Sequence, residues 1–204
     1  MTEKPITLTC DDLQLEGLLY RGGPNGVVVT HPHPLYGGNM YNAVVEIIVQ
    51  AFQEQNFSTL RFNYRGVGAS QGSYDHGTGE TRDTRQAMDY LAKIGIERYY
   101  LAGYSFGAWV NARLSLQESL DAEMVMVSPP VAFIDFEPRM SLPNLKLVVT
   151  GSRDEIAPEP LVRKSLADWN PAACFEVIPG ADHFYSGCCD KLADALTAKI
   201  VSEF

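Results

Sequence analysis

A five-residue turn, Gly-Tyr-Ser-Phe-Gly at residues 103–107, constrains the fold of this 204-residue chain more than any other stretch. Tyr99–Ala102 predicts the end of a buried strand, and Ala108–Leu116 predicts a helix. A serine between two glycines at this spacing is typical of a sharp strand-to-helix turn that strains the serine backbone. The hydroxyl then lies at the carboxyl edge of a sheet and at a helix N-terminus, where developing negative charge is stabilised. We therefore expect Ser105 to be a nucleophile.

The first part of the chain predicts an antiparallel hairpin followed by a buried strand. Ile6–Cys10 and Leu13–Tyr20 alternate apolar with polar residues, and the two aspartates between them are a turn signal. Val27–Val29 is a continuous β-branched run, which is typical of a central strand buried on both faces.

Strands and helices alternate from there to the end. The further predicted strands are Ser58–Tyr64, Met124–Val127, Leu145–Thr150 and Phe175–Ile178. The other predicted helices are Met40–Gln55 (capped by Asn39), Glu80–Ile94, Pro160–Asp168 and Cys188–Phe204. This order predicts an α/β fold in a single domain, 1–204: a mostly parallel sheet of about eight strands, flanked by helices, with the hairpin at one edge. The site of such a sheet lies outside the carboxyl ends of its strands.

Charge and composition limit the classes of binding partner, the location and the cofactors that we expect for this chain. The chain has 16 Lys and Arg against 25 Asp and Glu, a formal net charge of −9, which disfavours nucleic acid and anionic membranes. We find no secretory signal and no apolar run near the ~20 residues that span a bilayer, so we expect a cytoplasmic protein. The four cysteines fit free thiols and lack zinc-site spacing, so no metal or cofactor is expected. Monomer and homodimer both stay open.

A single histidine fits the role of base. A serine hydroxyl needs a base to accept its proton and a third group to orient that base. After a turn of this kind the chain order is serine, acid, histidine. Of the four histidines only His183 follows Ser105, and it lies just past a predicted strand. We therefore predict that His183 is the base.

The acid is chosen among several carboxylates. Asp154 directly follows the predicted strand Leu145–Thr150, where it can reach the last loop. Asp135, after the preceding strand, is the alternative. Asp182 is adjacent to His183, and neighbouring side chains in an extended segment point apart. We predict that Asp154 orients the base.

An oxyanion also needs two donors. One is expected from the backbone N–H of Phe106, the residue after the nucleophile, and the other from the loop after the first parallel strand. Pro32 and Pro34 in that loop have no N–H. The second donor is therefore predicted at Leu35, with Tyr36 as the next choice.

Other polar residues have structural interpretations. His31 and His33 are expected to shape and hydrogen-bond this loop rather than bind a metal. Arg65 is expected to pair with Glu80 or Asp83 and so hold a glycine-rich loop. Tyr36 is a predicted substrate contact. The candidate pocket walls are Tyr36, Tyr74, Phe133, Ile134, Phe136 and Phe184.

Five motifs in this order resemble the α/β-hydrolase superfamily over nearly the whole chain, most closely the small, lidless, dienelactone-hydrolase-like proteins of bacteria. They are His-Pro-His-Pro-Leu-Tyr-Gly-Gly-Asn at 31–39, Phe-Asn-Tyr-Arg-Gly-Val-Gly-Ala-Ser at 62–70, Gly-Tyr-Ser-Phe-Gly at 103–107, Gly-Ser-Arg-Asp at 151–154 and Asp-His at 182–183. The resemblance implies a Ser105–His183–Asp154 triad and an oxyanion hole near Leu35 and Phe106. The segment 131–144 is too short for a cap domain. The turn holds serine where dienelactone hydrolases have cysteine, so dienelactone hydrolysis is not implied.

The leading hypothesis is a serine hydrolase that cleaves a carboxylic ester or thioester of a small-molecule acyl substrate through an acyl-enzyme. An amidase or peptidase is the alternative among enzymes. A non-catalytic ligand-binding module on the same fold is the alternative outside them, and the intact serine, acid and histidine disfavour it.

Overall fold

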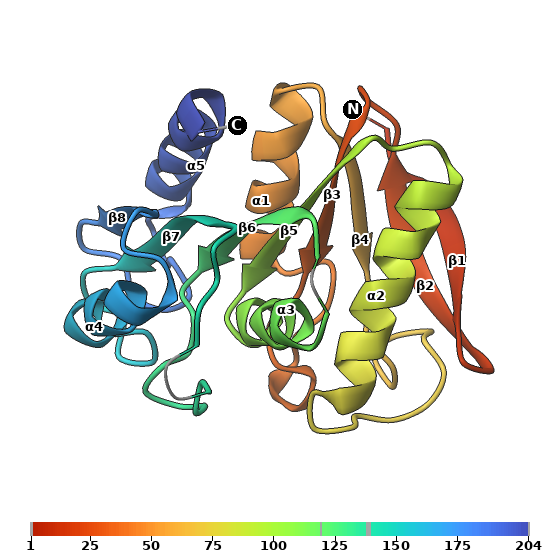
Figure 1. Ribbon diagram of the computed structural model, residues 1–204, viewed down its shortest axis with the longest axis horizontal. Coiled ribbons are helices and arrows are strands. Elements are labelled where there is room, and N and C mark those ends of the chain that lie inside the picture. The colour runs from red at the N-terminus through yellow and green to blue at the C-terminus, as the bar shows by residue number, and fades with distance from the viewer. Residues whose placement is uncertain (1, 119, 138–139, 204) are drawn as a thin grey trace.

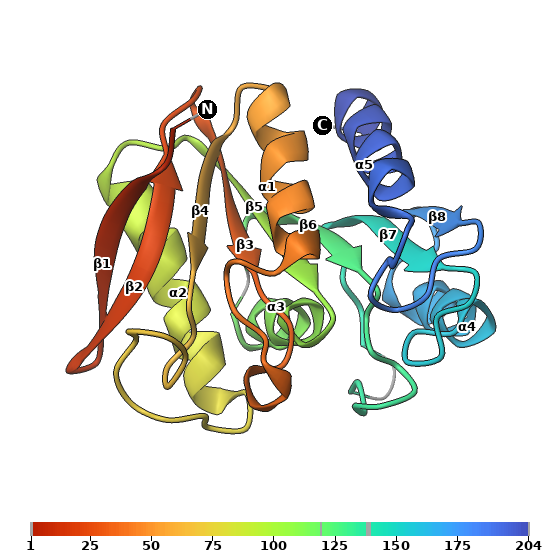
Figure 2. The ribbon, with the colours of Figure 1, turned by 180° about the vertical axis from the view of Figure 1, so that it is seen from behind.

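A computed structural model describes residues 2–118, 120–137 and 140–203. Within these residues the chain forms one eight-stranded sheet with helices on both faces (Figures 1 and 2). The strands are β1 (Lys4–Cys10), β2 (Leu13–Tyr20), β3 (Asn25–Thr30), β4 (Ser58–Phe62), β5 (Arg98–Tyr104), β6 (Ala122–Val127), β7 (Leu145–Gly151) and β8 (Cys174–Ile178). The helices are the 3₁₀ turn η1 (Pro34–Tyr36), α1 (Ala43–Glu54), α2 (Thr78–Lys93), α3 (Phe106–Gln117), α4 (Glu159–Trp169) and α5 (Cys189–Glu203).

The sheet has the order β1-β2-β4-β3-β5-β6-β7-β8. The hairpin β1–β2 is antiparallel and joins β4 in antiparallel register, and the pairs from β4 to β8 are parallel. The predicted eight-stranded, mostly parallel sheet with an N-terminal hairpin is therefore confirmed. Its parallel strands bring the loops that follow β3, β5, β7 and β8 to one edge.

Two apolar layers explain the continuous valine run. Helices α2, α3 and α4 cover one face of the sheet, and α1 and α5 cover the other (Figures 1 and 2). Val28 on β3 packs into the first layer, whereas Val27 and Val29 pack into the second. Successive side chains of a strand point to opposite faces, so a strand covered on both sides needs an apolar residue at every position.

Helix α1 begins later than expected. The cap is Asn42, whose side-chain oxygen accepts the N–H of Val44 at 2.9 Å. Asn39, the predicted cap, instead accepts the N–H of Tyr41 at 2.8 Å. Both are asparagines followed by apolar residues, and this local turn at Asn39 delays the helix by three residues.

The other predicted elements are found with ends shifted by a few residues. The last residue of the predicted final helix, Phe204, lies outside the described residues. In the segment 131–144, residues 131–137 and 140–144 contain no helix or strand. No helix in the described parts of the chain is both long enough and apolar enough to cross a bilayer.

Arg65 forms an ion pair with Asp83, which is one of its two predicted partners. Its Nη2 donates to Asp83 Oδ1 at 2.7 Å, and its backbone N–H donates to Oδ2 at 3.0 Å. The Asp83 side chain is fully buried. Glu80, the other predicted partner, instead accepts the N–H groups of Asp75 and Gly77 at the start of α2. The buried pair ties the glycine-rich loop after β4 to α2.

We expect Asp83→Ala to destabilise the fold by about 3–5 kcal/mol, because it leaves the buried Arg65 guanidinium without its buried partner; the carboxylate that remains, on the exposed Asp11, is 3.6 Å away. Denaturant unfolding measures this. The matched control is Asp89→Ala, which removes one of the two carboxylates paired with the half-exposed Arg85 on the same helix. Such a pair contributes less than about 1 kcal/mol. Equal losses in the two variants would contradict the importance of the buried pair.

Candidate active site

Ser105 lies at the junction between β5 and α3 with φ 54° and ψ −118°, which is a strained conformation for a residue other than glycine. A Cβ on Gly103 would lie 2.5 Å from the backbone nitrogen of Ala108. A Cβ on Gly107 would lie 2.5 Å from the carbonyl oxygen of Thr30 on β3. Both glycines are therefore required for the close approach of strand, turn and helix that the sequence motif predicts.

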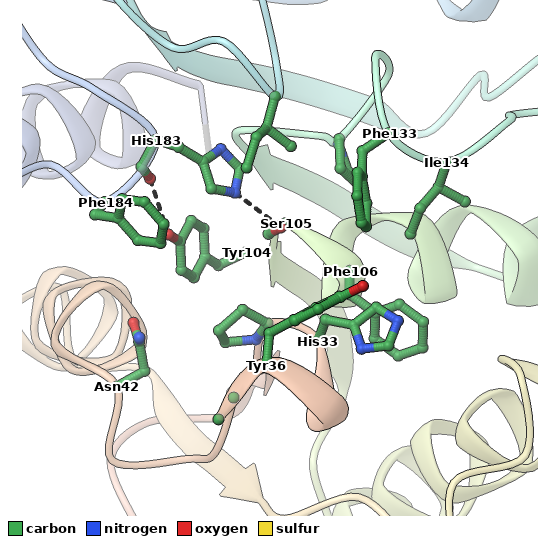
Figure 3. Close-up of a pocket in the computed structure, with 15 residues that line it drawn as sticks. His33, Tyr36, Asn42, Tyr104, Ser105, Phe106, Phe133, Ile134, His183 and Phe184 are labelled. Carbon is green, nitrogen blue, oxygen red and sulfur yellow. Dashed lines mark hydrogen bonds between the residues drawn. The ribbon is translucent and has the colours of Figure 1, made fainter.

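Three predicted side chains meet at this turn, and two of them, Ser105 and His183, are drawn in Figure 3. His183 Nε2 lies 3.0 Å from Ser105 Oγ. His183 Nδ1 lies 2.9 Å and 3.0 Å from the two carboxylate oxygens of Asp154. With Nδ1–H donating to the carboxylate, Nε2 is the acceptor for the Ser105 hydroxyl proton. The loops after β5, β7 and β8 thus bring a hydroxyl, an imidazole and a carboxylate into one hydrogen-bonded row.

Asp154 is held in its charged form. Its Oδ1 accepts the N–H groups of Ile156 at 2.9 Å and Ala157 at 2.7 Å. Burial acts to raise the pKa of Asp154, but hydrogen bonds and charge from His183 and the Ala157 N–H outweigh it, and the pKa is lowered. A carboxylate fixed by two backbone donors can orient the imidazole without moving itself.

The backbone of His183 has an anchor that the sequence did not indicate. The Tyr104 hydroxyl donates to the carbonyl oxygen of His183 at 2.8 Å. Tyr104 is the last residue of β5 and directly precedes Ser105. The strand that ends at the serine therefore also holds the histidine loop.

The two other carboxylates do not reach the imidazole. Asp135 is exposed, and its backbone carbonyl accepts the Trp109 indole N–H. The Asp182 side chain accepts the N–H of Ser186 at 3.0 Å. Of the three acids considered, the structure brings Asp154 to His183.

The backbone donors near Ser105 differ from the prediction at one position. The N–H of Leu35 donates to His33 Nδ1 at 3.2 Å, and that of Tyr36 donates to the His33 carbonyl at 3.1 Å. Leu35 is also absent from the residues that line the pocket at Ser105. Among the described residues, no acceptor takes the N–H of Phe106 or of His33, and both residues line the pocket.

The sequence itself indicates that His33 can supply a backbone donor in this loop. It stands between the two prolines that were excluded as donors, and so it keeps the N–H that they lack. The 3₁₀ turn that follows directs the Leu35 N–H back to the His33 ring. The His33 ring also contacts the Phe106 ring, with centroids 4.7 Å apart, and its Nε2 lies 3.3 Å from the Tyr74 hydroxyl. These contacts hold His33 against Phe106 at the pocket that contains Ser105.

His31 hydrogen-bonds this loop, as expected. Its Nε2 accepts the N–H of Tyr64 at 3.1 Å, so Nδ1 carries the proton that is donated to the Pro32 carbonyl at 2.7 Å. Burial lowers the pKa of His31 from 6.5 to about 4. The imidazole is therefore neutral in the folded protein at neutral pH.

This burial predicts a loss of stability in acid. The unfolded chain binds a proton at His31 below a pH of about 6.5, but the folded chain does so only near its lowered pKa of about 4. The free energy of unfolding therefore decreases as the pH is lowered from about 6.5 to about 4. At pH 5 the contribution of His31 to this loss is about 2 kcal/mol relative to neutral pH. Urea unfolding at pH 7 and pH 5 measures it. In His31→Gln the difference between the two pH values should shrink by that amount, and an unchanged difference would refute the assignment.

The pocket at Ser105 has a volume of about 380 Å³ and largely apolar walls. Four of the six predicted wall residues line it: Tyr36, Phe133, Ile134 and Phe184. The Tyr36 and Phe133 rings meet edge to face, with centroids 5.8 Å apart. Tyr74 instead supports His33 from behind, and Phe136 packs on Trp169. In residues 2–118, 120–137 and 140–203, no three His, Cys, Asp or Glu side chains are grouped as metal ligands.

Comparison with known proteins places this geometry in a family. No family model matches the chain. A curated, uncharacterised protein of Rickettsia prowazekii is 32% identical over 191 residues, which cover 88% of this chain and 80% of that protein. An α/β serine hydrolase homologue from Coxiella burnetii has 32% identity and a TM-score of 0.90, with 98% of each chain covered. An α/β serine hydrolase without a lid from Xanthomonas campestris has 28% identity and a TM-score of 0.88, with 99% of this chain and 95% of that chain covered. The chain therefore belongs to the α/β serine hydrolases, and its likeness to lidless members agrees with the short segment at 131–144.

Proposed function

We propose that this protein hydrolyses carboxylic esters or thioesters of small acyl substrates, with Ser105 as nucleophile, His183 as general base and Asp154 as the group that orients the base. The observation that carries the proposal is the row of contacts from Asp154 through His183 to Ser105 Oγ, at 2.9 Å and 3.0 Å. A buried histidine that donates to a carboxylate on one nitrogen and faces a serine on the other is arranged to remove the serine proton.

Acylation follows from this arrangement. Ser105 Oγ attacks the substrate carbonyl while its proton passes to His183 Nε2, and the imidazolium is stabilised by Asp154. The C–O or C–S bond then breaks, and His183 gives the proton to the leaving alcohol or thiol. A water molecule attacks the acyl-enzyme in the same way, with His183 again as base, and releases the acid and the free serine.

The oxyanion of each tetrahedral intermediate is proposed to bind the N–H groups of Phe106 and His33. Three observations support His33 over Leu35: the N–H of His33 has no acceptor among the described residues, His33 lines the pocket, and Leu35 already donates to the His33 ring. Fixed donors aimed at a developing oxyanion are worth roughly 10²–10³ in rate each.

The apolar walls support an uncharged acyl substrate. The pocket joins Ser105 to aromatic and aliphatic side chains such as Phe133 and Ile134. Esters and thioesters share the same acylation chemistry, so the choice between them rests with the leaving group. Amides need more assistance to the leaving nitrogen, and turnover of an anilide at a rate comparable to the matched ester would favour the amidase alternative.

Labelling with a fluorophosphonate, followed by peptide mass spectrometry, tests the proposal. We expect one adduct on Ser105 in the folded protein and none in Ser105→Ala. Turnover of 4-nitrophenyl esters and of acyl thioesters by the same preparation then identifies the preferred leaving group. A folded protein that neither forms the adduct nor turns over any of these substrates would favour a non-catalytic binding module.

A further inference from the structure

The pocket contains one amide group whose two ends have different surroundings. Asn42 lines the pocket and also caps α1. Its Oδ1 accepts the N–H of Val44 at 2.9 Å, which fixes the orientation of the amide. Among the described residues, no acceptor takes a hydrogen bond from its Nδ2. The cap therefore holds an unengaged donor at the wall of the pocket.

The pocket walls lie on two sides of Ser105 (Figure 3). Phe133 and Ile134 stand on one side, whereas Tyr104, Phe184 and Asn42 stand on the other. We call the second side the amide arm.

The amide arm is the side from which the base acts. The rings of Tyr104 and Phe184 flank the His183 ring, with centroid distances of 5.5 Å and 5.6 Å. In the proposed reaction, which this inference takes as its basis, His183 Nε2 gives its proton to the leaving oxygen. The leaving group must therefore lie on the His183 side of Ser105, and the acyl group extends toward Phe133 and Ile134.

We propose that Asn42 determines specificity by donating a hydrogen bond from Nδ2 to an oxygen in the leaving alcohol. The site then prefers esters of alcohols that carry an ether, carbonyl or hydroxyl oxygen over esters of plain alkyl alcohols. The Tyr104 hydroxyl of the same arm already donates to the His183 carbonyl, and the Phe184 side chain is apolar. Of the three residues of the amide arm, Asn42 is therefore the one whose side chain has a donor left for the substrate.

Helix capping alone does not account for the amide. Aspartate and serine cap helices about as well as asparagine, because each supplies a side-chain oxygen for the N–H groups of the first turn. Neither of them, in that position, keeps an amide N–H for a substrate. Asn42→Asp and Asn42→Ser therefore separate the two roles, since both retain the cap and both remove the amide donor at the Nδ2 position. The serine hydroxyl can still donate, but it ends one atom nearer the backbone and so does not reach that position. One adds a negative charge and the other does not, so an effect shared by the two reports the loss of the donor.

The test uses butyrate esters in matched pairs. The ester of 2-methoxyethanol is compared with that of 1-butanol, and the ester of 3-methoxypropanol with that of 1-pentanol. Within each pair an ether oxygen replaces one methylene group, and the two pairs place it at different distances from the ester. The ratio of kcat/KM within a pair is measured for the natural protein and both variants, so intrinsic differences between the alcohols cancel.

We expect the ether-to-alkyl ratio to fall roughly 3- to 10-fold in both variants for at least one pair, as for the loss of one neutral hydrogen bond. The melting temperature should change little, because both side chains retain the helix cap. Ratios unchanged in both pairs would overturn the role of Asn42. Turnover of 4-nitrophenyl butyrate with no turnover of the four alkyl and ether esters would overturn the assignment of the amide arm. If the natural protein hydrolysed none of the five esters, the proposed hydrolase function itself would be overturned.

Discussion

Ser105→Ala is expected to lower kcat for 4-nitrophenyl acetate by roughly 10⁵- to 10⁶-fold, the scale of loss when a serine nucleophile is removed. The substitution deletes one oxygen and keeps Cβ, so the turn at φ 54° and the walls of the pocket stay as they are. Binding should persist, because the apolar walls and the free N–H groups of Phe106 and His33 are untouched. Stopped assays with concentrated protein measure the residual rate.

The matched control is Ser186→Ala, which removes an exposed hydroxyl three residues beyond His183. This variant should keep full activity. If Ser105→Ala retained more than a small fraction of the natural rate, water activated by another group would have to replace the covalent step, and the role of Ser105 as nucleophile would be refuted.

Asp154→Asn is expected to lower kcat by about 10⁴-fold with little change in the fold. The new side chain keeps an oxygen for the N–H groups of Ile156 and Ala157, which both donate to Oδ1. Its NH₂ group then faces His183 Nδ1 and donates to it. The imidazole proton moves to Nε2, where it points at Ser105 Oγ and blocks the nitrogen that must accept the serine proton.

Asp182→Asn serves as the control, since that carboxylate adjoins the same histidine but accepts the N–H of Ser186. We expect a change of only a few fold there. Kinetics and thermal unfolding are measured on the same samples, so a loss of activity can be separated from a loss of fold. An Asp154→Asn variant with nearly natural kcat would show that another group orients the base.

The sequence predicts much of this site because its main parts are local. The turn around Ser105 is encoded by two glycines at a fixed spacing, and the chain order restricts the proposed base to His183. Asp154 follows from its place directly after a strand. The fold follows from the alternation of strands with helices, and the valine run of β3 is buried on both faces as its composition predicts.

The remaining details depend on contacts between distant segments or on competition between similar local patterns. The Tyr104 hydroxyl meets the His183 carbonyl across 79 residues of chain, a distance that no spacing rule covers. The second free N–H was predicted at Leu35 because a short 3₁₀ turn, and the hydrogen bond it makes to His33, was not foreseen. Asn39 and Asn42 compete to cap α1, and the choice is settled by the turn at Asn39.

The link between Tyr104 and the His183 backbone bears on how this site responds to heat. Strand β8, which leads to the histidine, lies at the edge of the sheet and is largely half-exposed, so its thermal fluctuations should exceed those of the central β5. Because the hydroxyl that binds the His183 carbonyl belongs to the residue next to Ser105, the positions of the serine and of the histidine loop both depend on the central strand β5. Thermal motion of β8 should therefore be taken up by the residues between Ile178 and His183. The contact between Ser105 Oγ and His183 Nε2 should then persist at temperatures at which the edge strand already fluctuates strongly.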